Sequence, residues 1–424
     1  MSAHVFRAGA LRGRIRVAGD KSISHRALML GAMAYGSTSI EQPNRGADVS
    51  ATRNAVIALG AHVVEHETGF IVRGGRVSSP ALPIDARNSG TTTRLLMGLC
   101  AGAGVTVTFD GDASLRRRPM ERIARPLRSI GADVTTTDGR LPATVRGIVG
   151  PPGGEFALEI PSAQIKSAIL LAHLGATGIV RIRGDRGSRD HTERMLRHFG
   201  RTIAFDGTTI ELQPGRLEPR RVRVPGDLSA AAFFLAAAAM TPGSDLVVEE
   251  VGINPTRAGV LEALILMGAQ VECRNQRDLD GEPVADVRVR SAKLHAIELD
   301  GDMVVRSIDE IPILAVVAAH ADGTTRIRGA GELRAKESDR LAALAQTLAA
   351  CGVPVTEYPD GLDITGGNAL IPGLPLPTFD DHRIAMAIAA LAAPTGAHAV
   401  AETASIAVSF PEFIERWEAA QRAS

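Results

Sequence analysis

This chain of 424 residues has little of what marks several protein classes. Positive and negative side chains balance at 47 each, so no net basic field exists to hold a polynucleotide or an anionic membrane surface. Aromatic residues make up only 3%, which leaves few rings on which the bases of a single strand could stack. The composition therefore argues against a nucleic-acid partner, and its 45% of hydrophobic residues is typical of a folded globular protein.

Cysteines and long apolar segments are also scarce. Cys100, Cys273 and Cys351 are an odd number without CxxC or Cys/His spacing, so neither a disulfide framework nor a structural zinc site is expected. The N-terminal residues contain no apolar core of signal-peptide length. The longest apolar run, residues 230–240, is about half of the ~20 residues that span a bilayer. We expect a cytoplasmic protein without a membrane partner.

Lysine is rare, because only four of the 47 basic residues are lysines: Lys21, Lys166, Lys293 and Lys336. A GC-rich coding bias that converts surface lysine to arginine would explain this scarcity. The lysines that remain would then include those whose compact, titratable ammonium group arginine cannot imitate. Three of the four lie inside the motifs described below.

A long-period repeat organises the chain. In each repeat a polar cluster opens an apolar helix, and a second helix then ends in a glycine turn before a hairpin, which the Asp-Gly pairs at 138, 206 and 360 indicate. Each unit is expected to run β-α-β-α-β-β, with five complete units and a sixth that ends in a helix from Pro411. The first helices are expected to begin near Ser22, Thr91, Gln164, Ser229, Ile311 and Arg383.

Six units of about 70 residues exceed a single core, which favours an α/β protein of two domains with three units each. We expect the first domain to cover residues 20–225 and the second to combine residues 1–19 with 226–424. A two-strand hinge would lie near Gly19 and Pro225. A passive repeat solenoid is the alternative architecture.

Several of the expected helix starts carry side chains suited to an anion. Lys21, Ser22 and Arg26 lie where a strand runs into a helix, and Ser22 and Arg26 share one helix face at four-residue spacing. The string NSGTTTR around Gly90 is a second helix start whose small residues let a ligand approach the backbone. Taken alone, the first motif favours a capped helix with a surface arginine, and the second is equally compatible with a simple helix cap.

Further polar clusters recur at later helix starts. The run of arginines from Arg116 to Arg118 is either a solvated loop or a movable anion clamp, since guanidinium groups suit phosphate and carboxylate. Asp227 carries no nearby cation in the sequence and is expected to be a helix cap alone. Cations that recur at equivalent positions of a neutral chain indicate a small, highly charged anion as ligand.

The motifs resemble those of the 5-enolpyruvylshikimate-3-phosphate synthases, a family of enolpyruvyl transferases. The resemblance covers nearly the whole chain in order, through the strings DKSISHRALMLGA, NSGTTTRLL, DASLRRRPM, SAQIKSAILLA, RDHTERML, DEIPILAV, RAKESDRL and DDHRIAM. It implies two inside-out α/β domains, each of three βαβαββ units. It also implies transfer of the enolpyruvyl group from phosphoenolpyruvate to the 5-hydroxyl of shikimate 3-phosphate, with release of phosphate, in the shikimate pathway to chorismate and the aromatic amino acids.

The resemblance assigns roles to residues that match the family motifs. Asp309 and Glu337 are implied as acid-base residues, with Lys21 as a further catalytic residue. Contacts to shikimate 3-phosphate are implied for Lys21, Ser22, Arg26, Ser162, Ala163, Gln164, Arg189, Asp309 and Lys336. Contacts to phosphoenolpyruvate are implied for Lys21, Gly90, Arg118, Gln164, Arg340 and Arg383. We expect no metal and no cofactor, and a monomer.

Two positions depart from the family pattern. Val408 stands where many members carry a lysine shortly before a C-terminal Phe-Pro, and Ala163 stands where a serine is often found. The resemblance also implies that glyphosate occupies the phosphoenolpyruvate pocket. Some motifs are closer to a glyphosate-insensitive branch, which often has alanine at the pocket position, but Gly90 leaves that space open. Because exclusion is steric and local, we expect the native protein to be inhibited.

Two other functions compete with this interpretation. UDP-N-acetylglucosamine enolpyruvyl transferases share the fold and the donor, but commonly carry a reactive cysteine in the mobile loop, where residues 116–120 have none. A non-catalytic anion-binding repeat protein would need neither Asp309 nor Glu337, and its binding would survive their replacement.

Overall fold

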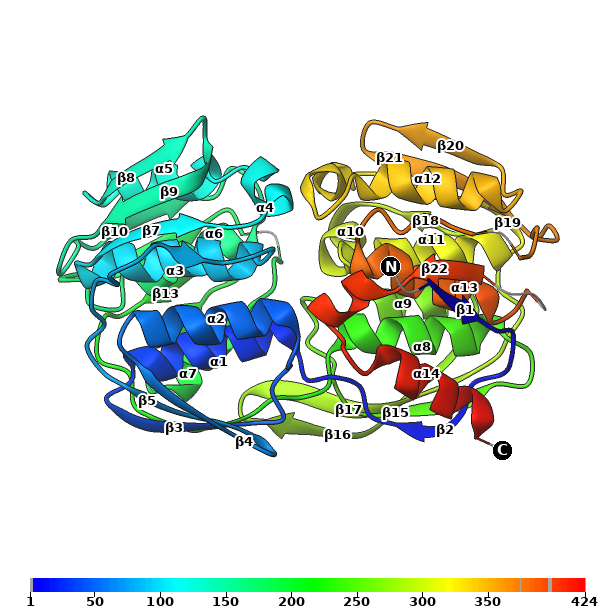
Figure 1. Cartoon of the computed structure of the whole chain (residues 1–424), viewed down its shortest axis with the longest axis horizontal. Coiled ribbons are helices and arrows are strands. Elements are labelled where there is room, and N and C mark those ends of the chain that lie inside the picture. Colours follow the sequence, from blue (N-terminus) through cyan, green and yellow to red (C-terminus); the bar gives the residue numbers. More distant parts are fainter. Residues whose placement is uncertain (1–2, 186, 374, 396–398, 424) are drawn as a thin grey trace. The chain divides into compact units, whose positions relative to one another are not determined.

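The structure is a computed structural model that describes residues 3–185, 187–373, 375–395 and 399–423 (Figure 1). The contacts divide the chain into two compact units. The first unit comprises Gly19–Val224 with Leu279–Glu282, and the second comprises Met1–Ala18, Pro225–Asp278 and Pro283–Ser424.

The described part of the first unit contains three four-stranded sheets of one topology. In each, the first strand pairs in parallel with the second, and the other two follow antiparallel. In spatial order the sheets are β14 (Arg221–Arg223), β3 (Gly36–Glu41), β5 (Gly69–Gly74) and β4 (His62–His66); β6 (Ile84–Asp85), β7 (Thr106–Asp110), β9 (Arg140–Arg146) and β8 (Asp133–Thr137); and β10 (Gly154–Ala157), β11 (Val180–Arg183), β13 (Thr209–Leu212) and β12 (Ile203–Phe205).

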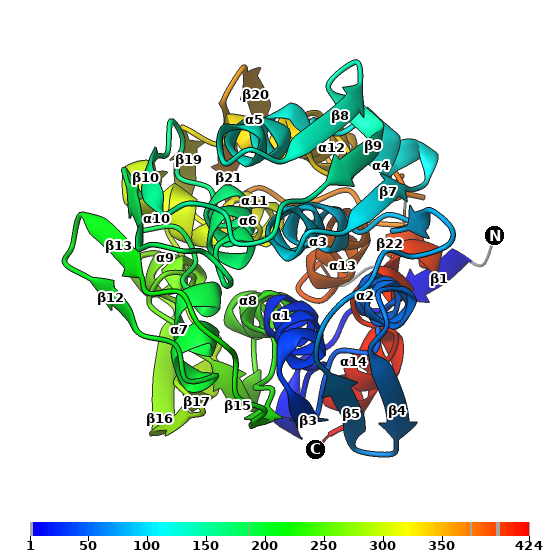
Figure 2. The same ribbon diagram turned by 90° about the vertical axis from the view of Figure 1, so that its left-hand side faces the viewer.

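Three largely buried helices form the centre of this unit: α1 (Lys21–Met33), α3 (Gly90–Ala103) and α6 (Ala163–Ala172). Figure 2 shows them nearly end-on, with the sheets lying outside them. Helices α3 and α6 approach closely because Gly98 and Gly102 have no side chain, and a Cβ there would lie 2.3 and 1.7 Å from α6 carbonyl oxygens. The remaining helices are α2 (Ala47–Ala58), α4 (Ala113–Arg117), α5 (Glu121–Ser129) and α7 (His191–His198).

In its described residues the second unit repeats this plan in two four-stranded sheets, and has an antiparallel pair of strands as its third sheet. Its sheets, in spatial order, are β16 (Gln270–Leu279), β17 (Glu282–Arg290), β15 (Asp245–Gly252) and β2 (Arg12–Ile15); β18 (Glu298–Leu299), β19 (Gly323–Ile327), β21 (Gly361–Gly366) and β20 (Val355–Tyr358); and the pair β1 (Ala3–Phe6) and β22 (Ala399–Glu402). Its largely buried helices are α8 (Leu228–Met240), α11 (Ile311–His320) and α13 (His382–Ala392). The others are α9 (Gly259–Leu266), α10 (Gly301–Ser307), α12 (Arg340–Ala350) and α14 (Phe413–Arg422), with 3-10 turns η1 (Gly331–Ala335) and η2 (Ala404–Val408).

Two strands complete a sheet far from their neighbours in sequence. β2 precedes the first unit in the chain but pairs in parallel with β15 of the second unit. β14 follows the three repeats of the first unit and pairs in parallel with β3 near their start. In each unit, one four-stranded sheet therefore contains a parallel edge strand that comes from a distant part of the sequence.

The expected repeat pattern is confirmed. Each of the six first helices begins within one residue of its predicted start, and the Asp-Gly pairs at 138, 206 and 360 lie in the hairpins that were predicted there. Residues 279–282, which the expected division gave to the second domain, group instead with the first unit. Asp280 there pairs with Arg223, and Glu282 with His191. The hinge near Gly19 and Pro225 stays a prediction.

Candidate active site

The central helices of the first unit begin with capping side chains. Asp20 Oδ1 accepts a hydrogen bond from Ile23 N at 2.8 Å, and Ser89 Oγ accepts from Thr92 N at 3.2 Å. Ser162 caps α6 in the same way. The first turn of a helix has more N–H groups than one cap can satisfy, and the helix dipole favours an anion there. These starts therefore suit a phosphate or carboxylate.

Lys21 and Arg26 are both tied to other side chains. Lys21 Nζ lies 2.9 Å from Asp48 Oδ2. The buried Arg26 donates from Nε to Thr192 Oγ1 at 2.6 Å and from Nη2 to Ser167 Oγ at 2.9 Å. Burial lowers the pKa of Arg26 to about 10, so it remains a cation at neutral pH. Its guanidinium is fixed by neighbouring helices before any ligand binds.

The sequence predicts that Ser22 and Arg26 share one helix face. In the structure Arg26 Nη1 donates a hydrogen bond to the backbone carbonyl of Ser22 at 3.1 Å. Arg189 lies in the segment that leads into α7, and its charge contributes, after burial, to the lowered pKa of Arg26. Ser162 is buried at the start of α6 and Ala163 is half-buried beside it. These residues surround the junction of α1, α6 and α7.

Gln164 and Arg94 form a second group, next to Gly90. Arg94 Nη1 donates to Gln164 Oε1 at 2.8 Å, and Gln164 Nε2 donates to Thr91 Oγ1 at 3.3 Å. A Cβ on Gly90 would lie 3.0 Å from Arg94 Nη1 and 3.5 Å from Arg118 Nη1. Two guanidinium groups therefore approach the start of α3 at Gly90, where no side chain is present. Arg94 is thus a further candidate site residue beside those predicted.

Arg118 is buried at the end of α4 and held by Asn88. Its Nη2 donates to Asn88 Oδ1 at 2.5 Å and to Ser114 Oγ at 3.2 Å, and its Nη1 donates to the Asn88 carbonyl at 3.3 Å. The other arginines of the run differ, since Arg116 pairs with Asp110 and Arg117 is exposed. Arg118 approaches the start of α3, where its Nη1 would lie 3.5 Å from a Cβ on Gly90.

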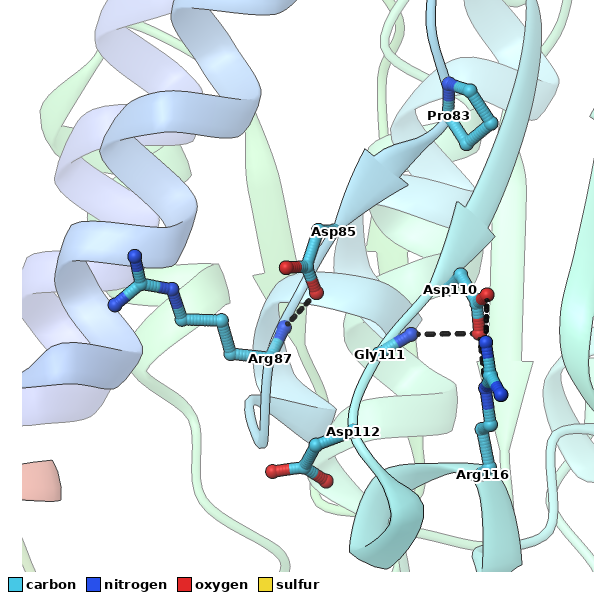
Figure 3. A pocket seen from close by; sticks show the side chains of 7 residues that line it. All are labelled: Pro83, Asp85, Arg87, Asp110, Gly111, Asp112 and Arg116. Atoms are coloured by element: carbon cyan, nitrogen blue, oxygen red, sulfur yellow. Dashed lines mark hydrogen bonds and ion pairs between the residues drawn. The ribbon is translucent and has the colours of Figure 1, made fainter.

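A pocket of about 400 Å³ in the first unit is not the predicted substrate site, because its described lining shares only Arg116 with the candidate anion clamp and includes none of the residues assigned to a substrate. Figure 3 shows these residues, Pro83, Asp85, Arg87, Asp110, Gly111, Asp112 and Arg116. The carboxylates are largely engaged, Asp110 with Arg116 and Asp112 with Asn88 Nδ2 at 2.8 Å. Since Asn88 also accepts a hydrogen bond from Arg118, it links Asp112 in this pocket to a predicted site residue.

The second unit gathers the remaining predicted residues around Arg340. Asp309 Oδ1 lies 3.4 Å from both Lys336 Nζ and Arg340 Nη1, and Glu337 Oε2 lies 2.7 Å from Arg340 Nη2. Burial works against a charged Arg340, but the charges of Asp381, Glu337 and Asp309 raise its pKa above the ordinary value. Both predicted acid-base carboxylates therefore contact the same permanent cation.

Asp381 and Arg383 lie at the start of α13. Asp381 accepts from Arg340 Nε at 2.8 Å and also caps α13 by accepting from Arg383 N at 2.9 Å. Burial alone would raise the pKa of Asp381, but the charge of Arg340 brings it below its usual range. Arg383 Nη1 donates to the Asp309 carbonyl at 2.9 Å. The start of α13 thereby fixes two of the predicted cations.

Sequence reasoning missed a buried group that adjoins Arg383. Glu310 Oε1 accepts a hydrogen bond from Ser229 Oγ and lies 3.7 Å from Arg383 Nη1. Arg257 Nη2 donates to Ser229 Oγ at 2.6 Å and to Asp227 Oδ1 at 3.0 Å. The predicted cap at Asp227 is confirmed by its bond from Ser229 N, but Arg257 supplies the cation that no local motif indicated.

Val408 is half-buried in η2, so this position offers no cation. Within the described residues, no group of His, Cys, Asp and Glu side chains is arranged to hold a metal ion. No described helix is both long enough and apolar enough to cross a membrane.

His25 is expected to make stability pH-dependent. This residue is buried in α1 with Nδ1 2.6 Å from Thr52 Oγ1, and burial, followed by the charges of Lys21 and Arg26, keeps its pKa well below 6.5. The unfolded chain takes up a proton on this imidazole near pH 6.5, so below that pH the unfolded state binds more protons. The free energy of unfolding therefore falls as the pH falls, by at most about 1.4 kcal/mol per pH unit from this group.

We expect His25→Asn to remove this contribution. Urea unfolding of both proteins at pH 7, 6 and 5 measures it, and the difference in unfolding free energy between them should shift steadily in favour of the variant. His173 and His320, whose pKa burial also lowers, remain in both proteins and cancel. A constant difference across the three pH values would contradict the prediction.

Comparison with known proteins identifies relatives over nearly the whole chain. A family model described as EPSP synthase (3-phosphoshikimate 1-carboxyvinyltransferase) matches residues 6–417. A 3-phosphoshikimate 1-carboxyvinyltransferase of Synechocystis sp. is 48% identical over 415 residues, covering 95% of this chain and 92% of the relative. One of Geobacter sulfurreducens is 47% identical over 423 residues, covering 97% of both.

Solved structures give the same result. EPSP synthase from Acinetobacter baumannii superposes with a TM-score of 0.87 at 39% identity, covering 99% of this chain and 98% of that chain. The enolpyruvyl transferase NikO of Streptomyces tendae shares the fold, with a TM-score of 0.77 at 19% identity, covering 98% and 96% of the two chains. The predicted fold class is confirmed.

Proposed function

Because this chain belongs to the EPSP synthase family and is a transferase, we propose that it moves the enolpyruvyl group of phosphoenolpyruvate to the 5-hydroxyl of shikimate 3-phosphate. The observation that carries the proposal is that Asp309 and Glu337, a potential acid-base pair, both contact Arg340. The reaction belongs to the shikimate pathway, which supplies the aromatic amino acids.

The cations of the first unit would bind the acceptor. In this proposal Lys21, Ser22, Arg26, Ser162, Ala163, Gln164 and Arg189 contact shikimate 3-phosphate, with Ala163 limited to backbone contacts. The fixed guanidinium of Arg26 and the N–H groups at the start of α6 suit its phosphate. Asp309 and Lys336 of the second unit would complete the acceptor site.

Phosphoenolpyruvate would be held by the residues that approach Gly90 and by the Arg340 cluster. We place Lys21, Gly90, Arg118, Gln164, Arg340 and Arg383 around it. Arg340 and Arg383 remain cations beside buried carboxylates, and guanidinium forks match a carboxylate or phosphate in two contacts. Because Val408 stands in place of a lysine, the donor's charge would be balanced by the other cations assigned to it, Lys21, Arg118, Arg340 and Arg383.

The chemistry requires one group that donates a proton and one that accepts it. Carbon 3 of the enol gains a proton while the 5-hydroxyl loses one and attacks carbon 2, which gives a tetrahedral ketal. In the second step carbon 3 loses a proton, the double bond forms again and phosphate leaves. Asp309 and Glu337 would carry these protons, and Lys21 would balance charge on the substrates.

The release of inorganic phosphate from phosphoenolpyruvate tests this function. Phosphate should appear with shikimate 3-phosphate as acceptor and not with UDP-N-acetylglucosamine. Turnover with UDP-N-acetylglucosamine would instead show that the protein acts as a UDP-N-acetylglucosamine enolpyruvyl transferase. Binding of shikimate 3-phosphate without any turnover would instead support an anion-binding protein.

We also propose that substrates draw the two units together about the segments near Gly19 and Pro225, because cations of both units are assigned to the same pair of substrates. Closure would exclude water from the ketal intermediate. Small-angle X-ray scattering should show a smaller radius of gyration at saturating shikimate 3-phosphate. A radius that stays the same at saturation would exclude this hinge motion.

We infer a cytoplasmic monomer. The three cysteines are free, as expected in a reducing compartment, and one chain supplies all the residues that the proposal needs. Light scattering after size exclusion should give a mass near 44.5 kDa, and a stable mass of twice that value would contradict the monomer.

A further inference from the structure

Lys166 is a buried lysine that the proposed chemistry does not use. Its side chain on α6 is 0% exposed, and Nζ lies 2.7 Å from Asp185 Oδ2 and 2.6 Å from Glu193 Oε1. Nζ also donates to the Ser188 carbonyl at 3.2 Å. The three N–H groups of the ammonium thus meet three oxygens.

This geometry explains why a chain so poor in lysine has one here. An ammonium group at the end of a flexible stem can direct three donors to three acceptors in different directions, whereas a guanidinium presents its donors in one plane. The three acceptor oxygens around Lys166 Nζ therefore suit an ammonium group and not a guanidinium group. Lys293, by contrast, is 87% exposed and pairs with Asp322 on the surface, where arginine would serve equally well.

The contacts of Lys166 run beside those that hold Arg26. Ser167, the next residue of α6, contacts Thr192 Oγ1 at 2.6 Å, and both of these hydroxyls accept hydrogen bonds from Arg26. Residues 166–167 of α6 therefore face residues 192–193 of α7. A displacement of α7 would move the partners of Arg26.

Lys166 also holds the segment that carries Arg189. The carbonyl of Ser188, which Lys166 binds, belongs to the residue directly before Arg189. Arg26 and Arg189 come from separate elements, and burial with the charge of Arg189 already opposes the charge on Arg26. Two cations whose charges act on each other need fixed surroundings if they are to bind one anion together.

The positive charge of Lys166 has a second effect, which acts on the two carboxylates beside it. Asp185 and Glu193 are buried carboxylates, and the charge of Glu193 acts on Arg26. Without the ammonium between them, these carboxylates would compete with a bound phosphate for the neighbouring guanidinium groups.

We propose that Lys166 is a positioning residue that aligns Arg26 and Arg189 for the phosphate of the acceptor without contacting it. The proposal rests on the proposed function for the identity of that phosphate. Its prediction is selective: loss of Lys166 weakens binding of the acceptor far more than binding of phosphoenolpyruvate.

The experiment compares Lys166→Met, Lys166→Arg and the double variant Lys166→Met with Glu193→Gln, using Lys293→Met as the matched surface control. Calorimetry with shikimate 3-phosphate alone gives the acceptor Kd, and steady-state kinetics give kcat and both KM values. We expect Lys166→Met to raise the acceptor Kd about tenfold or more and the phosphoenolpyruvate KM less than threefold. Lys166→Arg should resemble it, the double variant should recover part of the affinity, and Lys293→Met should match the native protein.

Several outcomes would overturn the proposal. An acceptor Kd that stays native in folded Lys166→Met, or two KM values that rise equally, would show that Lys166 does not act on the phosphate site. If Lys166→Met fails to fold, the acceptor Kd of the double variant tests the proposal in its place, because the double variant removes one buried negative charge together with the ammonium group. A native Kd in that variant would contradict the proposal. A native protein that neither binds shikimate 3-phosphate nor releases phosphate would contradict the proposed function itself, and this measurement comes first.

Discussion

Replacement of Glu337 by glutamine, or of Asp309 by asparagine, is expected to lower kcat by about 10² or more, the usual scale for a general acid or base. Each amide keeps the shape of the carboxylate but can neither donate nor accept the reacting proton. The KM values should change much less, because Arg340 keeps its bonds to the buried Asp381 in both variants. Steady-state kinetics with both substrates measure the effect.

Asp339→Asn is the matched control for these variants. Asp339 follows Glu337 by two residues but caps α12 through a bond from Ala342 N at 3.1 Å and pairs with Arg334. Asparagine is also a good helix cap, so this variant should keep native kcat. Normal turnover of either Glu337→Gln or Asp309→Asn would remove that residue from the proton transfers. A loss in Asp339→Asn as large as theirs would attribute the effect to the local fold.

The helix starts could be predicted because their signals are local. A capping side chain, an apolar run and a glycine turn lie within about a dozen residues of one another, and the structure places the first helices where these signals occur. The hairpins at Asp138, Asp206 and Asp360 follow from equally short patterns.

The partners of the cations could not be predicted, since they come from distant repeats. Arg26 binds Thr192 and Ser167, which follow it by 166 and 141 residues, and Arg94 binds Gln164 70 residues later. Periodicity places such residues at helix starts but does not tell which starts pack together. Arg257 lies in the same repeat as its partners Asp227 and Ser229, but its bonds to them depend on how α8 packs, which the local sequence does not show.

Local patterns also do not reveal two roles for one residue. Asp381 lies next to the helix start that the sequence predicts near Arg383, and it caps that helix, α13. Asp381 is also the buried ion-pair partner of Arg340. The sequence motif around Arg340 does not indicate this pairing. The close approach of α3 and α6 depends likewise on Gly98 and Gly102, whose purpose is visible only when the second helix is in place.

Gly90→Ala is expected to weaken inhibition by glyphosate while the native protein is inhibited competitively with phosphoenolpyruvate. The new methyl group would lie 3.0 Å from Arg94 Nη1 and 3.5 Å from Arg118 Nη1. Arg94 cannot move freely, because that same nitrogen donates to Gln164 at 2.8 Å. An added methyl in a close-packed site costs about 1–3 kcal/mol, which corresponds to roughly 5- to 150-fold in an inhibition constant.

The cost should fall mainly on the inhibitor, since glyphosate is longer than phosphoenolpyruvate and has less room to shift away from the methyl group. The inhibition constant and the phosphoenolpyruvate KM are therefore measured for both proteins. Gly175→Ala serves as control, because a Cβ at that position meets no atom within 4 Å. Equal inhibition of the native protein and Gly90→Ala, or a KM that rises as much as the inhibition constant, would contradict the steric explanation. In the second case the methyl group would act on donor and inhibitor alike, through the shared guanidinium groups of Arg94 and Arg118.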